Sequence, residues 1–248
     1  LVIYQNDGNG NFTNVSTAAL QDHAGNHHQI AVGDVDGDGS RDIYAPSGNG
    51  SAHFLFINDG AGLFLDEAEV RLPTDYPKGG AARMGDVDND GDLDIVVSDG
   101  YGGGAPPFAH LYINDGTGMF DEAIDAMPST VMGNNIDDVE FFDADRDFDL
   151  DIFVNAHAGG LGSLWLNDGA GGFAAGGTMP PPGPNSQYHY NATPCDVDND
   201  GDLDMWIDNT GGGYVEQLLI NDGSAHFTDE TNARVTGNQS EDDNGVIC

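Results

Sequence analysis

The residues of this chain most able to do chemistry are aspartates, which recur in a nine-residue pattern. The first copy reads Asp34-Val-Asp36-Gly-Asp38-Gly-Ser-Arg-Asp42, and three further copies begin at Asp86, Asp143 and Asp196. We call them the first to fourth acidic loops (34–42, 86–94, 143–151 and 196–204) and number their residues as positions 1 to 9. Aspartate stands at positions 1, 3, 5 and 9 of every copy, and glycine stands at position 6 of three.

Such a loop is suited to a hard cation. Alternating side chains converge on one point, the carbonyl at position 7 can add a ligand, and glycine allows the sharp reversal. Carboxylates this crowded repel one another unless a cation lies among them. An oxygen-only set favours Ca²⁺ over zinc or copper, and Mg²⁺ prefers to keep several waters. The sequence therefore predicts about four calcium ions, one per loop. The expected metal ligands are Asp34, Asp36, Asp38, Ser40, Asp42, Asp86, Asp88, Asp90, Asp92, Asp94, Asp143, Asp145, Asp147, Asp149, Asp151, Asp196, Asp198, Asp200, Asp202 and Asp204.

The third acidic loop departs from this pattern. Phe148 stands where the other loops have glycine, and Arg146 lies among the acids. Phe148 must adopt a backbone conformation that glycine supplies elsewhere, and Arg146 should reduce the local negative charge. We expect this site to be the weakest or differently coordinated.

A second motif, Asn-Asp-Gly-x-Gly-x-Phe, is interleaved with the acidic loops. Its five copies begin at Asn6, Asn58, Asn114, Asn167 and Asn221, with alanine for the second glycine in the last copy. The two motifs recur at nearly the same intervals along the chain, which indicates a tandem repeat of about 53 residues. Alternatively Asp and Gly could merely form turns, but four matching acidic copies argue against that interpretation.

Each repeat contains four short segments rich in strand-forming residues. One precedes the acidic loop (Gln29–Gly33), one follows it (42–44), a third is apolar (54–57), and the phenylalanine of the hairpin motif anchors a fourth. No stretch shows helical periodicity. We therefore predict an all-β fold of four-stranded antiparallel blades, as in a β-propeller; a linear β-solenoid is the alternative.

The repeat phase predicts the domain organisation. We expect residues 1–248 to form a single β-propeller segment, with a further blade starting at 238–248 and a partial blade at 1–13. The four complete blades are expected at 28–64, 82–120, 138–173 and 191–227. A segment of a larger propeller is the favoured interpretation. A five-bladed ring closed by strands from both ends is the alternative.

These motifs resemble a known family. The acidic loops are similar to the Asp-x-Asp-x-Asp-Gly-x-x-Asp sites of FG-GAP repeats in integrin α-subunit propellers, and the hairpins are similar to those of bacterial VCBS repeats. The resemblance implies calcium-binding propeller blades. An EF-hand is similar over its first six positions, but position 12 here is apolar instead of Glu (Ala45, Val97, Val154 and Ile207).

The resemblance also implies that the acidic loops lie on one face of the propeller. The segments between blades (13–28, 65–81, 121–137, 174–191) and the loops between second and third strands (45–53, 98–110, 155–163, 208–217) would build the opposite face. We expect this loop face to bind a protein or carbohydrate ligand. The candidate residues are His27, His28, Tyr101, His110, His157, Tyr188, His189, Tyr190 and Tyr214.

Composition limits the function further. The 43 acids against 6 bases, a net charge of −37, exclude duplex nucleic acid as a partner, and no apolar run is long enough for direct membrane insertion. Calcium loops of this kind need the calcium concentration found outside the cytoplasm, so we expect an extracellular, cell-surface or periplasmic location. A rigid adhesion, ligand-binding or surface-assembly module is favoured over an enzyme. The alternative is the propeller domain of a polysaccharide lyase or another carbohydrate-active enzyme, in which a Tyr/His pair could serve as acid and base.

The two cysteines occupy equivalent places in successive repeats. Cys195 and Cys248 each stand just before the place of an acidic loop. A disulfide between them is one interpretation, and two buried free thiols are the favoured one.

Overall fold

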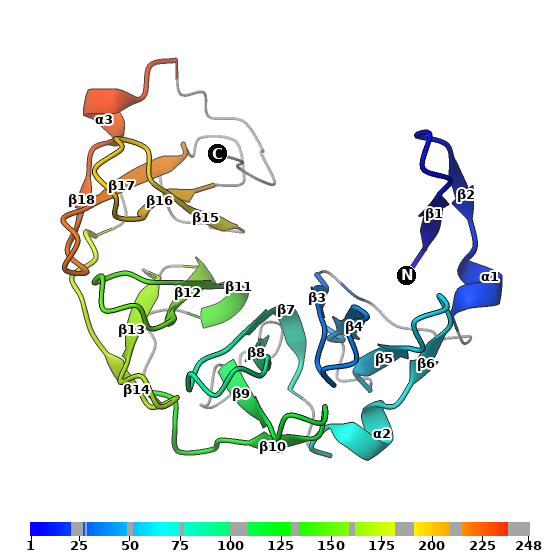
Figure 1. Cartoon of the computed structure of the whole chain (residues 1–248). Helices are drawn as coiled ribbons and strands as arrows, with labels where there is room; N and C mark the ends of the chain where they lie inside the picture. Colours follow the sequence, from blue (N-terminus) through cyan, green and yellow to red (C-terminus); the bar gives the residue numbers. More distant parts are fainter. Residues whose placement is uncertain are drawn as a thin grey trace.

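A computed structural model describes most of the chain. The described residues are 1–20, 27, 29–48, 52–74, 77–99, 109–129, 134–158, 162–181, 191–208 and 215–237. They form four four-stranded antiparallel sheets and one two-stranded sheet (Figure 1). The all-β fold with four-stranded antiparallel units is therefore confirmed.

The sheets follow the chain in order, and each is a simple succession of neighbouring strands. The two-stranded sheet comprises β1 (Tyr4–Asn6) and β2 (Phe12–Asn14). The first sheet comprises β3 (Ala31–Gly33), β4 (Asp42–Ala45), β5 (Phe54–Asn58) and β6 (Phe64–Asp66). The second comprises β7 (Gly79–Gly85), β8 (Asp94–Asp99), β9 (Ala109–Asn114) and β10 (Phe120–Glu122). The third comprises β11 (Asn134–Phe142), β12 (Asp151–Ala158), β13 (Ser163–Asn167) and β14 (Phe173–Ala175). The fourth comprises β15 (Ala192–Cys195), β16 (Asp204–Ile207), β17 (Gln217–Asn221) and β18 (Phe227–Asp229).

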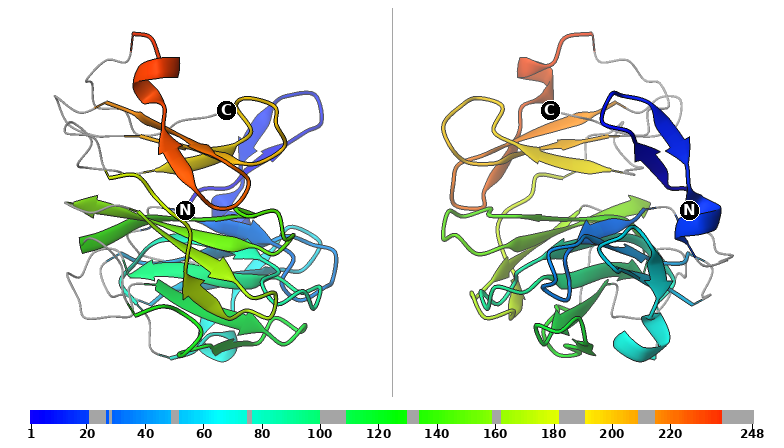
Figure 2. Two further views of the ribbon diagram at one scale, coloured as in Figure 1. Left: turned by 90° about the vertical axis from the view of Figure 1, so that its left-hand side faces the viewer. Right: turned by 45° about the vertical axis from the view of Figure 1, so that its right-hand side comes forward.

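The four larger sheets succeed one another along an arc, in the manner of propeller blades. Their first strands β3, β7, β11 and β15 line the inner side of the arc, and β6, β10, β14 and β18 lie on its outer side (Figure 1). The first strands of successive sheets contact one another. Figure 2 shows the same succession of sheets from two other sides. In each of the four larger sheets an acidic loop joins the first two strands, and an Asn-Asp-Gly hairpin joins the last two.

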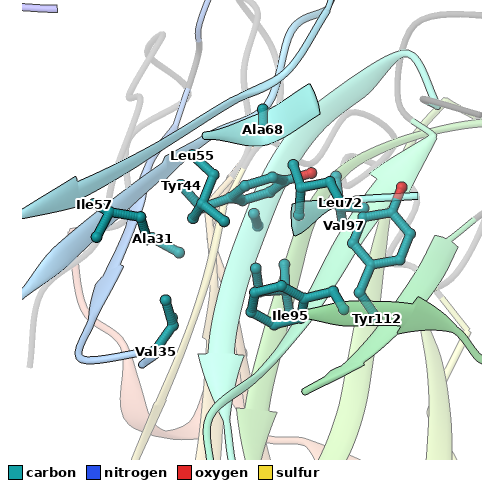
Figure 3. Packing of buried hydrophobic residues seen from close by; sticks show 12 residues of the cluster. Ala31, Val35, Tyr44, Leu55, Ile57, Ala68, Leu72, Ile95, Val97 and Tyr112 are labelled. Carbon is teal, nitrogen blue, oxygen red and sulfur yellow. The ribbon is translucent and has the colours of Figure 1, made fainter. Parts of the chain in front are cut away.

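The hydrophobic core lies between the sheets. In β8, Ile95 and Val97 belong to the cluster shared with the first sheet, whereas Val96 belongs to the cluster shared with the third. Figure 3 shows the first of these clusters, in which Tyr44 packs near Val97 and Tyr112 of the next sheet. Successive strand residues point to opposite faces, so an interior sheet is apolar on both. Burial of such a side chain contributes about 1.5–3 kcal/mol, so each sheet depends on its neighbours.

Among the described residues, three single-turn helices each follow the last strand of a sheet, and the sequence did not predict them. They are α1 (Ser16–Ala19), α2 (Ala68–Arg71) and α3 (Thr231–Arg234). Before each one, an Asn or Asp accepts the N–H two residues onward: Asn14 at 3.0 Å, Asp66 at 3.1 Å and Asp229 at 3.0 Å. This side-chain bond starts the turn. Four residues are too few to show a helical period. None of the helices in the described ranges has the length and apolar character needed to cross a membrane.

Cys195 ends β15 and is disulfide-bonded. The expectation of a free thiol at this position is therefore wrong. The other cysteine of the sequence, Cys248, lies outside the described residues.

Candidate metal sites in the acidic loops

The fold brings carboxylates of each acidic loop together. In each loop, three of the predicted residues offer oxygen atoms that all lie within 4.8 Å of one another. The first, third and fourth loops contribute positions 1, 3 and 9, and the second contributes positions 1, 3 and 5. These groups are Asp34, Asp36 and Asp42; Asp86, Asp88 and Asp90; Asp143, Asp145 and Asp151; and Asp196, Asp198 and Asp204. The four position-7 residues, Ser40, Asp92, Asp149 and Asp202, are outside these groups.

The position-9 aspartate connects the two sequence motifs. In the second sheet, Asp94 is fully buried, and its Oδ2 accepts the N–H of Val87 at 3.0 Å. Its Oδ1 accepts the N–H of Asn114, the first residue of the hairpin motif, at 2.9 Å. Asp42, Asp151 and Asp204 make the same two bonds in their sheets. Burial raises the pKa of Asp94 and of Asp151 to about 6.

The position-1 and position-5 aspartates shape the loop. Asp34 Oδ2 accepts the N–H of Gly39 at 2.8 Å, and Asp86, Asp143 and Asp196 accept the corresponding N–H of their own loops. Asp38 Oδ1 accepts the N–H of Ser40 at 2.6 Å, a bond with counterparts in the other loops. Backbone N–H groups of the loop therefore fix the orientation of these carboxylates.

The position-3 aspartate has an oxygen for which the described part of the chain supplies no hydrogen-bond donor. Oδ1 of Asp36, Asp88, Asp145 and Asp198 is buried and has no hydrogen-bond donor among the described residues. Burial raises the pKa of Asp88 and of Asp145, and the neighbouring carboxylates Asp90 and Asp147 raise it further. A buried carboxylate oxygen without a partner is costly, and here the same atom is unpaired in four repeats. Its recurrence fits a cation as the missing partner.

The third loop has the backbone conformation that its sequence predicts. Phe148 has a φ of +73°, in the region where Gly39, Gly91 and Gly201 lie at +89°, +98° and +88°. Its side chain is 88% exposed, so packing does not offset the strain. The acids at positions 1, 3 and 9 nevertheless meet as they do in the first and fourth loops.

Arg146, in the third loop, interacts with the fourth loop, which the sequence did not suggest. Its Nη2 donates to the carbonyl of Asp200 at 2.7 Å and lies 3.6 Å from Asp202 Oδ2, both in the fourth loop. Arg146 was expected to reduce the negative charge of the third loop, but the ion pairs that the structure describes for it are with acids of the fourth loop. Asn89, at the same position of the second loop, likewise donates to Asp149 of the third at 2.8 Å. The position-4 side chain thus reaches position 7 of the next loop.

Sequence reasoning missed how the hairpins connect neighbouring sheets. Asn114 Nδ2 donates to the carbonyl of Val35, at position 2 of the preceding acidic loop, at 2.8 Å. Asn167 donates to Val87 at 2.7 Å, and Asn221 donates to Ala144 at 2.8 Å. Each of these three hairpins therefore supports both its own acidic loop and the loop before it, which explains why the two motifs alternate regularly along the chain.

Most of the predicted ligand-face residues lie outside the described residues: His28, Tyr101, Tyr188, His189, Tyr190 and Tyr214. The structure describes only the backbone of His157. His27 Nδ1 lies 2.8 Å from the carbonyl oxygen of Pro46, and its ring packs edge-on against Phe54. His110 Nδ1 lies 2.6 Å from Glu122 Oε1. The two described candidates are thus held by contacts within the protein.

A buried histidine that the sequence did not single out lies between the first two sheets. His53 Nδ1 is 2.5 Å from the Tyr44 hydroxyl, and its Nε2 is 2.8 Å from the carbonyl oxygen of Pro77. Burial lowers the pKa of His53 to about 4, which keeps the ring neutral at physiological pH. No sequence motif marks this residue.

Comparison with known families agrees with the resemblance seen in the loops. A family model described as the FG-GAP-like repeat matches residues 1–45 and 45–97. The matched residues include the first and second acidic loops and the strands that flank them, which are β3, β4, β7 and most of β8. No curated protein matches the chain. The expected resemblance to FG-GAP repeats is therefore confirmed.

Proposed function

From the FG-GAP-like repeats that match residues 1–97, we propose that the chain is a calcium-binding module of β-propeller type, with one Ca²⁺ site in each acidic loop. The observation that carries the proposal is the position-3 Oδ1 atom, buried and without a donor among the described residues in all four loops. The carboxylates grouped within 4.8 Å of one another would hold the ion. Oxygen ligands without nitrogen or sulfur suit Ca²⁺. Bound Ca²⁺ would offset the mutual repulsion of these carboxylates.

Calcium should contribute much of the stability. Each site stabilises the folded state by RT ln(1 + [Ca²⁺]/Kd), about 2.7 kcal/mol at a 100-fold excess over Kd. Four independent sites would add roughly 10 kcal/mol. Because the loops lie beside the intersheet bonds of Asn114, Asn167 and Asn221, the ions would also strengthen the contacts between sheets.

Calorimetric titration and thermal unfolding test this proposal together. We expect about four Ca²⁺ ions to bind and the melting temperature to rise by many degrees between excess chelator and millimolar calcium. Asp88→Asn should remove or weaken one site. Asp125→Asn, which removes an exposed carboxylate outside the loops, is the matched control and should leave binding unchanged. Indistinguishable melting curves with and without calcium would refute the metal assignment.

We extend the proposal to the role of the module. The module would be secreted to the extracellular space, cell surface or periplasm, where calcium is plentiful. It would bind a protein or carbohydrate ligand, or assemble on a surface, through the face opposite the acidic loops. Cores shared between sheets and intersheet hydrogen bonds support a rigid scaffold of this kind.

A glycan array combined with a turnover screen on acidic polysaccharides separates this role from the alternatives. Binding without turnover would support the adhesion or ligand-binding module. β-Elimination products would instead support the polysaccharide-lyase alternative. Each measurement should be repeated in chelator, because loss of the calcium-stabilised fold should abolish binding.

A further inference from the structure

Two of the six lysine and arginine residues of the chain form ion pairs with position-3 aspartates. Arg71 Nη2 lies 3.7 Å from Asp36 Oδ2 in the first loop. Arg234 Nη2 lies 3.2 Å from Asp198 Oδ2 in the fourth loop. In both cases the arginine approaches Oδ2, and Oδ1 of the same carboxylate is the buried atom without a donor among the described residues. Arg71 belongs to the segment 65–81, which the sequence analysis assigned to the opposite face, and yet its side chain reaches the first acidic loop.

The same local structure holds both arginines. Arg71 is the last residue of α2, and Arg234 is the last residue of α3. A glutamate four residues earlier, just before the helix, accepts a hydrogen bond from the guanidinium Nε. It is Glu67, at 2.6 Å, before α2 and Glu230 before α3. Arg71 Nη1 also donates to the carbonyl of Thr117 at 2.6 Å. A Cβ added at the neighbouring Gly118 would lie 2.6 Å from that nitrogen, so the hairpin leaves room for the arginine.

The second and third sheets lack this arrangement. Counting from the phenylalanine of the hairpin motif, Glu67 and Glu230 stand three residues onward and the two arginines seven residues onward. The second sheet has Ala123 and Met127 at these places, and the third has Gly176 and Pro180. The four acidic loops therefore fall into two classes, two with an arginine on position 3 and two without.

We propose that Arg71 and Arg234 are built-in counter-cations of the first and fourth acidic loops, which make these two sites weaker for Ca²⁺ than the second and third. The inference rests on the proposed calcium-binding function. It concerns the ranking of the sites, and it reverses the expectation that the third loop is the weakest.

Charge, and not orientation, is what the arginine adds. Asp88 and Asp145 lie in the same carboxylate groups of their loops without any arginine, so the position-3 side chain does not need one to reach its place. The effect of the arginine is therefore electrostatic. Its guanidinium, beside Oδ2, would repel a divalent ion bound to Oδ1 of the same carboxylate. At a separation on the order of 5 Å this repulsion lowers affinity by about tenfold, even at the dielectric constant of water.

The two arginine sites should differ in degree. The Arg71 side chain is 16% exposed, whereas that of Arg234 is 37% exposed, so solvent screens the second arginine more. The fourth loop, however, also receives Arg146 on Asp202. We expect a shift of about tenfold when Arg71 is neutralised and about threefold when Arg234 alone is neutralised.

Nuclear magnetic resonance can resolve the four loops individually. The position-6 amides of Gly39, Gly91, Phe148 and Gly201 each donate to the first aspartate of their own loop, so each reports on one site. During titration with buffered calcium chloride, we expect the Gly91 and Phe148 amides to respond at lower free calcium than those of Gly39 and Gly201. Arg71→Gln should lower only the Gly39 midpoint, by about tenfold, and Arg234→Gln should lower only the Gly201 midpoint.

Two further variants isolate the charge. Arg71→Lys keeps the positive charge and should keep the wild-type midpoint. Arg41→Gln removes an exposed positive charge from the same loop and should shift the Gly39 midpoint by less than about twofold. If Arg71→Lys behaves like Arg71→Gln, the arginine acts through its geometry and the inference is wrong.

A measurement without resonance assignment provides a second test. A tenfold tighter first site enlarges the gap in melting temperature between saturating calcium and chelator by about 3–6 °C in Arg71→Gln. The gap should not change in Arg41→Gln. Equal midpoints for all four loops, with no shift in the arginine variants, would overturn the inference and leave calcium binding intact. If no loop amide responds to calcium, the proposed function itself fails and the inference fails with it.

Discussion

Replacing Asn114 by alanine removes the side chain that ties the second sheet to the first acidic loop. Its Nδ2 donates to the carbonyls of Val35 at 2.8 Å and Leu93 at 3.1 Å. Its Oδ1 accepts the N–H groups of Gly116 at 3.1 Å and Gly118 at 3.0 Å. The residue is only 2% exposed, so water cannot replace these partners.

Asn58 is the matched control. It holds the same place in the first sheet, donates to the carbonyl of Arg41 at 3.1 Å and accepts the N–H of Gly60 at 3.1 Å. Among the described residues it has no hydrogen bond to a neighbouring sheet. Asn58→Ala therefore removes the local part of the motif, and Asn114→Ala also removes the intersheet part.

The expected magnitude follows from the number of hydrogen bonds. A net contribution of about 1 kcal/mol per bond gives a loss of about 4 kcal/mol for Asn114→Ala, and about 1–2 kcal/mol for the partly exposed Asn58→Ala. The difference of about 2–3 kcal/mol corresponds to roughly 4–12 °C in melting temperature for a chain of this size. Calorimetry and urea unfolding, both in saturating calcium, measure these differences. Equal losses in the two variants would refute the reasoning, because the two additional bonds of Asn114, to Val35 and from Gly118, would then contribute nothing.

Three further predictions follow from single side chains. Burial lowers the pKa of His53 to about 4 in the folded protein, from 6.5 in the unfolded chain. Between pH 6.5 and pH 4 the unfolded chain therefore binds this proton more readily than the folded protein does, and the free energy of unfolding decreases by about 3 kcal/mol as pH falls across that window. In urea unfolding as a function of pH, His53→Gln should abolish this component; an unchanged pH profile would contradict the assignment. Phe148→Gly should stabilise the protein by about 1 kcal/mol in chemical denaturation, because it relieves a φ of +73° without loss of packing, and a loss of stability would show that the phenyl ring contributes contacts. Asp88→Asn should lower the melting temperature in calcium, because it removes a ligand, but leave it unchanged or raise it in chelator, because it also removes a repelling charge. Scanning calorimetry in both buffers measures this difference. Equal losses in the two buffers would argue against a cation at this position.

The local parts of the fold could be predicted from the sequence because their causes are local. Asn-Asp-Gly turns, glycines with positive φ and short runs of β-branched residues act within a few residues, so the strands and the loops that join them follow from the chain itself. The grouping of the carboxylates in each acidic loop could be predicted for the same reason, since its members lie within nine residues. The single-turn helices have a local signal too, Asp66 or its equivalent two residues after the phenylalanine, but it is too short to stand out without the structure.

Other features could not be predicted, because they depend on which sheet lies beside which. Arg146 was expected to act on its own loop and instead reaches Asp202 of the next. Cys195 was expected to be a free thiol and is disulfide-bonded. The buried His53 meets the carbonyl of Pro77, 24 residues onward, and no pattern in the chain connects the two.

The sequence by itself determined the repeat, its four strands and the carboxylates of the candidate metal sites. Only the tertiary structure decided how the repeats act on one another. It placed Asn114 on the carbonyl of Val35, 79 residues earlier, and Arg71 on Asp36. The physical reason is that hydrogen bonds and ion pairs act over a few ångströms in space, and the stacking of apolar sheets decides which distant residues come that close.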